Sequence, residues 1–256
     1  MHIAVTDEAI LLVVKFRIGG SSRFLSHAET LRVFQRACVR AGIEIQYTQG
    51  FNPHPKLSLP LPRSVGVESD DELLCLKMDG STGALVSAKA RAGAAQEHKS
   101  ASELCDSIKT NLSQQLPEGF ELLSVTISET DAIIQPCLVT YVLPVREEYF
   151  NEKLKQRVKQ LLASESINVT RQLDAKGLKF KDIDVRGFLK SIVLNDSCIV
   201  VECRIALRGS IRVEEILKLL GLDMEKLAGP IRRTSVQWQE TDDGRQMTED
   251  GRGTND

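Results

Sequence analysis

The chain has 256 residues, of which 42% are hydrophobic and 27% are charged, and its formal net charge is −2 at pH 7. This length can bury a full core as one large domain or as two domains of about 100 to 130 residues. The longest apolar runs, such as Ala9–Val14, are much shorter than the roughly 20 residues of a membrane-spanning helix. Because Met1–Thr6 also lacks a secretory pattern, the sequence excludes a membrane protein and predicts a cytoplasmic one.

The cysteines point to the same compartment. They are scattered without any C-x-x-C pair, and each lies in a segment that reads as helix or strand. This spacing argues against a disulfide framework and a zinc site, and it predicts reduced residues of the core. We therefore expect neither a metal nor another cofactor. The six residues are Cys38, Cys75, Cys105, Cys137, Cys198 and Cys203.

The small net charge hides an uneven distribution. From Lys15 to Arg63 the chain carries eight basic and two acidic residues, a net charge of +6. Residues 239–256 carry six acidic and two basic residues, a net charge of −4, with almost no apolar side chains. Such a segment cannot offset its ordering entropy by burial, so we predict an acidic disordered tail over 239–256.

The first half is predicted to run strand, helix, strand, strand, helix, strand. Leu11–Ile18 begins as an apolar run and then alternates, as a half-buried strand does. Ser26 and Glu29 have the spacing of a capping box, so a helix should begin there, and Gly42 can end it in a left-handed turn. The other predicted elements of this half are strands Ile43–Tyr47 and Glu72–Met78, a flexible insertion over 80–101, helix Ser102–Leu116 and strand Phe120–Ile127.

The second half repeats this order, beginning with strand Leu138–Val145 and helix Asn151–Ala163. The repeat predicts an α+β fold of tandem ferredoxin-like (βαββαβ) domains with antiparallel sheets. These domains would span residues 1–130 and 131–238 and join near Glu129–Pro136. The remaining predicted elements are strands Ile167–Gln172, Val185–Leu194, Cys198–Leu207 and Ile231–Trp238, a hairpin turn at Asn195-Asp196-Ser197 and helix Val213–Leu220.

Three arginines share one side of the first predicted helix. Arg32, Arg36 and Arg40 lie at i, i+4 and i+8, opposite its apolar side. A planar guanidinium group donates two hydrogen bonds to a phosphate at once. Glu29 is the only acidic side chain nearby, so the pattern favours an anion-binding face. A solvated helix face is the alternative reading.

The stretch Gln49–Pro62 (QGFNPHPKLSLPLP) holds four of the eight prolines. Prolines fix φ and lower the entropy lost when a ligand docks, so this loop, beside the arginines, predicts a preformed anion site. Tyr47 and Phe51 could stack on a base or plug the sheet, and we favour the plug for Phe51. The candidate ligand-binding residues are Arg23, His27, Arg32, Arg36, Arg40, Gln49, Asn52, His54 and Lys56.

Two histidines lie where they could do chemistry. His27 is at the first turn of the helix, and His54 lies between two prolines of the loop. A histidine can bind a phosphate or act as a general acid or base near neutral pH. For His54, a hydrogen bond to the loop backbone is the alternative role. No third polar group of catalytic type follows either histidine at short range.

Several motifs, with their joint spacing, resemble the radical SAM-linked protein family, a bacterial family fused or adjacent to cobalamin-binding radical SAM proteins. The resemblance is strongest over Val13–Met78 and weaker through Pro117–Gly119 and Lys181–Val193. Family members commonly carry an aspartate early in the first helix, where this chain has Glu29 or Thr30. The motifs are Arg23–His27 (RFLSH), Arg32, Arg36-Ala37, Ala41-Gly42-Ile43, Gln49–Lys56 (QGFNPHPK) and Gly66–Ser69 (GVES).

The resemblance implies a radical SAM protein as partner and supplies no catalytic residues. The chain lacks the C-x-x-x-C-x-x-C triad of an iron–sulfur cluster, so any radical chemistry would need a separate protein. We therefore expect an accessory module, more a binding protein than an enzyme, that binds RNA or a phosphorylated ligand. Two alternatives stay open: a metal-independent RNA-processing nuclease that uses His27 and His54, and a protein-interaction adaptor.

Arginines of the second half could extend the basic track, but a shared face is not expected. Arg204 lies on a predicted strand and Arg208 in a turn, so their side chains need not point the same way. The five residues are Arg204, Arg208, Arg212, Arg232 and Arg233.

Overall fold

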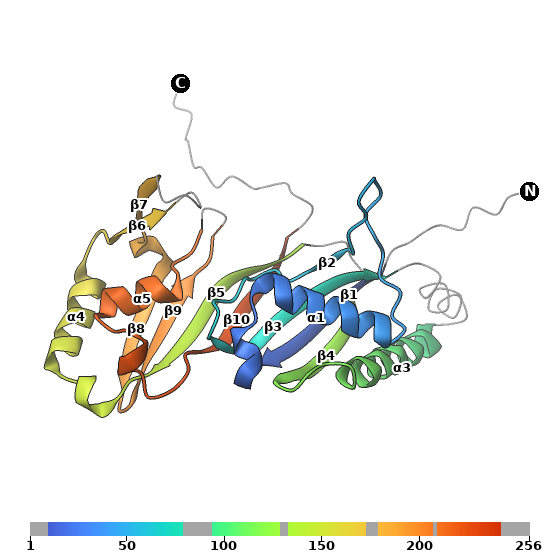
Figure 1. The fold of residues 1–256 in the computed structure, drawn as a ribbon, viewed down its shortest axis with the longest axis horizontal. Coiled ribbons are helices and arrows are strands. Elements are labelled where there is room, and N and C mark those ends of the chain that lie inside the picture. Colours follow the sequence, from blue (N-terminus) through green and yellow to red (C-terminus); the bar gives the residue numbers. More distant parts are fainter. Residues whose placement is uncertain (1–9, 79–93, 129–132, 173–178, 207–208, 242–256) are drawn as a thin grey trace, which may run out of the picture.

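The computed structural model describes residues 10–78, 94–128, 133–172, 179–206 and 209–241. They form an eight-stranded sheet, a separate two-stranded sheet and helices that pack on the large sheet (Figure 1). All strand pairs except one are antiparallel, so the predicted α+β class, rich in antiparallel sheet, is confirmed. Among the described helices, none has the length and apolar character needed to cross a membrane.

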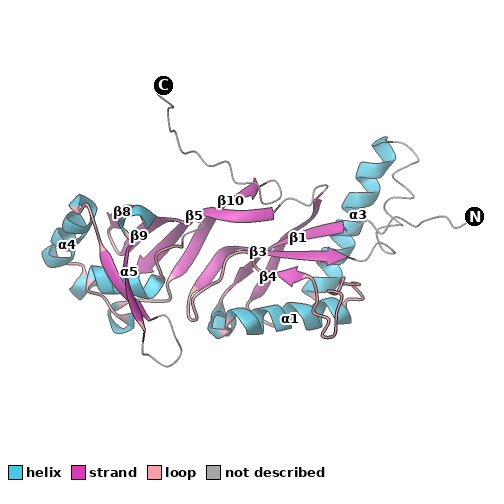
Figure 2. Cartoon of the chain, turned by 90° about the horizontal axis from the view of Figure 1, so that it is seen from above, coloured by secondary structure: helices cyan, strands magenta, loops and turns pink. Residues whose placement is uncertain are grey.

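The first half contributes four strands in the order β4-β1-β3-β2, with α1 and α3 on one face of the sheet (Figure 2). Strand β1 alternates as expected, and its buried side chains pack under the helices with Phe34 and Leu112. The elements are β1 (Ile10–Ile18), α1 (His27–Arg40), β2 (Leu57–Ser58), β3 (Glu68–Met78), α3 (Ala94–Ser113) and β4 (Phe120–Ser128).

The second half contributes strands in the order β10-β5-β9-β8, and α4 and α5 cover it with a second core cluster. A hairpin of β6 and β7 is added beside them (Figure 1). The elements are β5 (Ile133–Pro144), α4 (Glu152–Ala163), β6 (Asn168–Gln172), β7 (Phe180–Asp184), β8 (Leu189–Asn195), β9 (Cys198–Arg204), α5 (Val213–Leu220) and β10 (Arg232–Thr241). Short 3-10 helices cover Gly20–Phe24, Glu147–Tyr149, Arg186–Phe188 and Met224–Lys226.

One short parallel pairing joins the two halves into a single sheet. Arg232 and Arg233 of β10 pair with Glu68 and Ser69 of β3. The Arg233 side chain is fully buried and forms an ion pair with Glu72 of β3. The join between the halves is therefore made both by backbone hydrogen bonds and by a buried charge pair.

The structure corrects two predicted strands. Ile43–Tyr47 is not a strand: only isolated bridges occur there, from Ile45 to Met78 and from Tyr47 to Pro55. The strand that pairs with β3 on this side is β2. Between Tyr47 and β2 the chain forms the proline-rich loop, whose prolines have no N–H to donate to a strand ladder. Ile167–Gln172 does form a strand, but it pairs with β7 and not with the large sheet, whose corresponding strand is β8.

Several predicted boundaries also move. Residues 94–101 of the predicted insertion belong to α3, while the rest of it lies outside the described residues. Ile133–Pro136, assigned to the linker, begins β5, and Gln239–Thr241, assigned to the tail, ends β10. These two ends pair with each other, since Gln239 lies opposite Gln135 and Thr241 opposite Ile133. The rest of the predicted tail lies outside the described residues.

Candidate anion-binding surface

Helix α1 begins where the sequence predicts, because the capping box forms. The Glu29 backbone N–H donates to Ser26 Oγ at 3.3 Å, and the Ser26 N–H donates to Glu29 Oε2 at 2.8 Å. The Ser26 hydroxyl also donates to Glu29 Oε2, at 2.6 Å, and these bonds lower the pKa of Glu29. Glu29 is thus engaged in holding the helix start.

The helix buries its apolar side and presents arginines on the other. Phe34 packs against Phe16 and Phe120, with ring centroids 4.7 and 5.5 Å away. Arg32, Arg36 and Arg40 are exposed, as the spacing predicts. Among the described residues none of the three arginines makes an ion pair. The described ion pairs lie elsewhere.

The arginines border two open grooves, and no described carboxylate lines either one. The first, of about 530 Å³, runs along α1 past Gln35 and Val39. The second, of about 400 Å³, lies between α1 and the end of α3. Arg40 is anchored there because its Nη2 donates to the Gln115 carbonyl at 2.7 Å. Its other guanidinium N–H groups make no described hydrogen bond and stay available to a ligand.

The proline-rich loop stands clear of the body of the molecule. In Figure 1 it is the blue segment that follows α1 and precedes β2. Gln49, Asn52 and His54 are exposed, and Lys56 Nζ donates to Gln46 Oε1 at 3.0 Å. Phe51 does not plug the sheet as predicted. Its side chain is fully exposed, because the loop carries residue 51 beyond the edge strand.

Arg23 does not belong to the arginine row of α1. Its Nη1 donates to the Gly20 carbonyl at 2.8 Å and lies 3.8 Å from Glu68 Oε1, and its guanidinium stacks 4.5 Å above the Phe24 ring. These contacts hold it near the join of the two halves, where Arg232 also pairs with Glu68, at 2.8 Å. The structure thus brings together only part of the predicted set.

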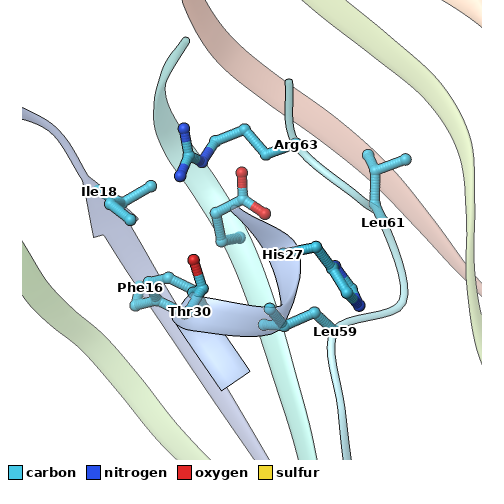
Figure 3. Close-up of a pocket in the computed structure, with 8 residues that line it drawn as sticks. Phe16, Ile18, His27, Thr30, Leu59, Leu61 and Arg63 are labelled. Carbon is cyan, nitrogen blue, oxygen red and sulfur yellow. The ribbon is translucent and has the colours of Figure 1, made fainter. Parts of the chain in front are cut away.

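His27 lines a small cavity between α1, β1, β3 and the chain that follows β2 (Figure 3). The space, about 10 Å³, is close to the room that one water molecule needs. Figure 3 shows the His27 ring beside Leu59 and Leu61. Its Nδ1 is buried and has no described hydrogen-bond partner, so a water would satisfy it.

The two histidines lie far apart. His27 shares its cavity with Glu72, whereas Lys56, near His54, accepts a backbone hydrogen bond from Lys77 at 2.9 Å. Glu72 and Lys77 are five residues apart on β3, about 17 Å along the strand. An acid and a base that act on one phosphate must both reach it by hydrogen bonds. This fold does not place His27 and His54 where both could hydrogen-bond the same phosphate.

Sequence reasoning did not select Arg63, which organises the motif-bearing loops. Its guanidinium donates to the carbonyls of Leu25 at 3.0 Å and Arg23 at 2.7 Å, and also to that of Val67. Burial lowers its pKa from the usual value, but an arginine stays charged. A basic residue directly after the two leucine-proline pairs was the available signal. Arg63 ties RFLSH to GVES, so these motifs are held together by structure.

The second-half arginines do not extend the basic track as far as the structure describes them. Arg233 is buried, and Arg232 is paired with Glu68 and with Asp70. Arg204 donates to the Gly187 carbonyl at 3.5 Å, and exposed Arg212 precedes α5. Arg208 lies outside the described residues.

Burial makes several of the cysteine thiols unreactive. Burial raises the pKa of Cys38 to about 12 and that of Cys75 to about 11, so both thiols stay protonated near neutral pH. All six cysteines are free. Within the part of the chain that the structure describes, no group of three His, Cys, Asp or Glu side chains is arranged so that it could hold a metal ion.

Comparison with known proteins yields a family and a distant structural likeness. Residues 12–218 match a family described as an uncharacterized protein conserved in bacteria (DUF2344). A crystal structure of the acetolactate synthase small subunit from Thermotoga maritima aligns over 91% of this chain and 98% of its own, with 10% identity and a TM-score of 0.22. None of the curated proteins matches the chain.

Proposed function

The chain belongs to the bacterial family DUF2344, and we propose that within this family it is a binding module for the phosphate backbone of RNA. The observation that carries the proposal is the row of Arg32, Arg36 and Arg40 on the exposed face of α1, along grooves without a described carboxylate. Exposed arginines of an ordinary helix face usually have acidic neighbours one turn away. Here Glu29 attracts Arg32 but accepts its hydrogen bonds from Ser26, so it does not pair with the row.

The shape of this row favours a polyanion over a single phosphate. Successive arginines are four residues apart, about 6 Å along the helix axis, so the row follows a line and does not converge on one point. Each guanidinium can donate two hydrogen bonds to a phosphate. Both grooves beside the row are open, which suits a long ligand that lies across the surface.

We also infer that each half is a ferredoxin-like unit and that the module serves a radical SAM enzyme. The strand orders β4-β1-β3-β2 and β10-β5-β9-β8 support the first inference, because both are the order of a βαββαβ unit. The motifs RFLSH and QGFNPHPK motivate the second. Co-elution of the chain with the cobalamin-binding radical SAM protein of the same bacterium in gel filtration tests the partnership, and separate elution at micromolar concentration contradicts it.

The separation of His27 from His54 makes the nuclease the weaker alternative. The protein-interaction adaptor is the second candidate, because the proline-rich loop is exposed. Incubation with total RNA distinguishes the three functions. Retention without cleavage supports the binding module, and discrete cleavage supports the nuclease. If the RNA is neither retained nor cleaved, the adaptor is favoured.

The first prediction removes two arginines of the row. In the variant Arg32→Ala/Arg36→Ala, two phosphate contacts are lost, so the affinity for a single-stranded RNA falls. The slope of log affinity against log salt is also expected to flatten by about 1.4, since each contact accounts for roughly 0.7. Fluorescence anisotropy of a labelled oligonucleotide from 50 to 200 mM salt measures both.

The matched control removes two exposed lysines from α4, Lys153→Ala/Lys159→Ala. This variant loses the same charge from a helix of the other half, so its affinity and salt slope should stay near those of the parent chain. Equal effects in the two variants would mean that only net charge matters and would contradict a site on α1. Both variants should fold normally, because exposed substitutions usually change stability by less than about 0.5 kcal/mol.

A further inference from the structure

The proline-rich loop has a stem that holds a fixed shape. Tyr47 and Pro55 form a bridge, and the Thr48 N–H donates to the His54 carbonyl at 2.8 Å. The His54 N–H donates back to Thr48 Oγ1 at 2.9 Å. The Lys56 N–H donates to the Gln46 carbonyl at 2.7 Å, which continues the stem toward β3. The tip beyond this stem is thus presented at a defined place.

The tip carries an aromatic ring that nothing covers. Phe51 is fully exposed, and Tyr47 on the stem is 45% exposed. An exposed phenylalanine gives up the hydrophobic stabilisation that burial would supply, so the fold does not benefit from its position. Gly50, with φ of +137°, lets the chain turn at the tip in a conformation that few other residues adopt.

The surroundings of Phe51 distinguish among partners. Apart from Gly50 and the prolines, its neighbours along the loop are polar or basic, and Gln49–Lys56 contains no acidic residue. A single ring in such surroundings does not make the apolar patch that a protein partner usually covers. It does suit a nucleobase, because every base has a π face that stacks on an aromatic side chain regardless of sequence. Residues 41–48 connect the loop to the end of α1 that bears Arg40.

We propose that Phe51 is a stacking platform for an unpaired base, and that the ligand of this protein is single-stranded RNA. This inference rests on the proposed function, in which the arginines of α1 hold the backbone. In a duplex the bases are already stacked on one another and their faces are closed to the loop. The combination of a basic track and a protruding ring therefore favours single strands over duplexes.

The test compares Phe51→Ala with Phe180→Ala, a matched loss of an exposed phenylalanine, 62% exposed, in the β6–β7 hairpin. The probes are a 12-nucleotide oligouridine, a duplex RNA hairpin and inorganic polyphosphate, which has no bases. Phe51→Ala is expected to weaken oligouridine binding about tenfold, with an unchanged salt slope, and to leave polyphosphate binding unchanged. Phe51→Trp should restore the affinity, and its fluorescence should be quenched by oligouridine. Phe180→Ala should change none of these.

Arg32→Ala/Arg36→Ala separates failure of this inference from failure of the proposed function, because it should weaken both oligouridine and polyphosphate. If it does so while Phe51→Ala has no effect, stacking is wrong and the phosphate-binding function stands. If Phe51→Ala weakens all three probes equally, the ring does not read bases and the inference is also overturned. If neither variant changes binding, the proposed function fails and the inference fails with it. Loss of co-elution with a radical SAM protein in Phe51→Ala, with unchanged RNA binding, would reassign the loop to protein docking.

Discussion

Two adjacent arginines at the join have opposite roles. Arg232 is half exposed and pairs with Glu68 at 2.8 Å, whereas Arg233 is fully buried. Strand alternation sends neighbouring side chains to opposite faces, and this separates them. Besides its ion pair with Glu72, Arg233 donates from Nε to Ser69 Oγ at 3.3 Å. Burial would lower the pKa of Arg233, but the attraction and hydrogen bonds of Glu72 and Tyr141 together raise it. The buried charge of Arg233 stabilises the fold only while the Glu72 carboxylate is present.

The second prediction concerns this buried pair. Arg233→Met keeps the length of the side chain but leaves the buried Glu72 carboxylate without its ion-pair partner, with only the attraction of Arg63 remaining. This change is expected to cost about 3–5 kcal/mol of unfolding free energy. Arg232→Met removes an exposed pair and should cost less than about 1 kcal/mol. Urea denaturation of both variants measures the difference. Similar losses in the two would show that burial of Arg233 does not determine the stability of the join.

At the scale of an element, α1 shows a helix whose start depends on one reciprocal pair of hydrogen bonds. The carboxylate of Glu29 accepts from both the backbone and the hydroxyl of Ser26. A protonated carboxyl accepts such bonds poorly, so the cap depends on the charge of Glu29.

The third prediction concerns how the stabilisation by Glu29 changes with pH. The pKa of Glu29 is lowered in the fold, so its stabilising contribution is present above the usual glutamate pKa and is lost as pH falls through the lowered value. Glu29→Gln should therefore unfold at lower urea than the parent chain at pH 7, and the two midpoints should converge in acid. Measuring both midpoints from pH 7 down to pH 3 checks this, and a constant gap across that range would contradict it.

A structural feature can be predicted from the sequence when the residues that cause it lie close together along the chain. The start of α1, its arginine row and the alternation of β1 follow from residues a few positions apart, so these were predictable. The place of β2 was not, because pairing with β3 decides it. Phe51 was misassigned because an aromatic residue beside a strand usually packs, and only the path of the proline-rich loop reveals its exposure. The partner of Arg233 lies 161 positions away in the sequence, and no local pattern can identify it.

At the scale of the whole molecule, the halves share a sheet but keep separate cores. One cluster lies under α1 and α3, and the other lies under α4 and α5. The connection consists of a two-residue parallel pairing, the Arg233–Glu72 pair and polar contacts such as Trp238 Nε1 donating to Asp71 Oδ1 at 3.3 Å. Val67 and Leu61 of the first half also pack against the second cluster. Domains that each bury their own core can in principle fold alone.

The fourth prediction uses a fragment of residues 1–130. It holds the whole first core, so it should unfold cooperatively, but at lower urea than the full chain because Glu72 loses Arg233. Glu72→Gln is then expected to destabilise the full chain and to change the fragment much less, since the full chain loses the pair with Arg233 and the fragment has already lost it. Circular dichroism in urea measures all four midpoints. Equal losses in both contexts would contradict the assigned role of the pair.

The strand that closes the sheet is made last. Strand β10 lies between β3 and β5, so both of those edges stay open on a ribosome until the final described strand has emerged. From Glu72 to Arg233 the ribosome adds 161 residues, which takes about 8 to 30 s at usual rates of synthesis. During that interval the nascent chain displays unpaired strand edges of the kind that recruit other chains. Slow or truncated synthesis would therefore be expected to increase its aggregation in the cell, even when the finished protein is stable.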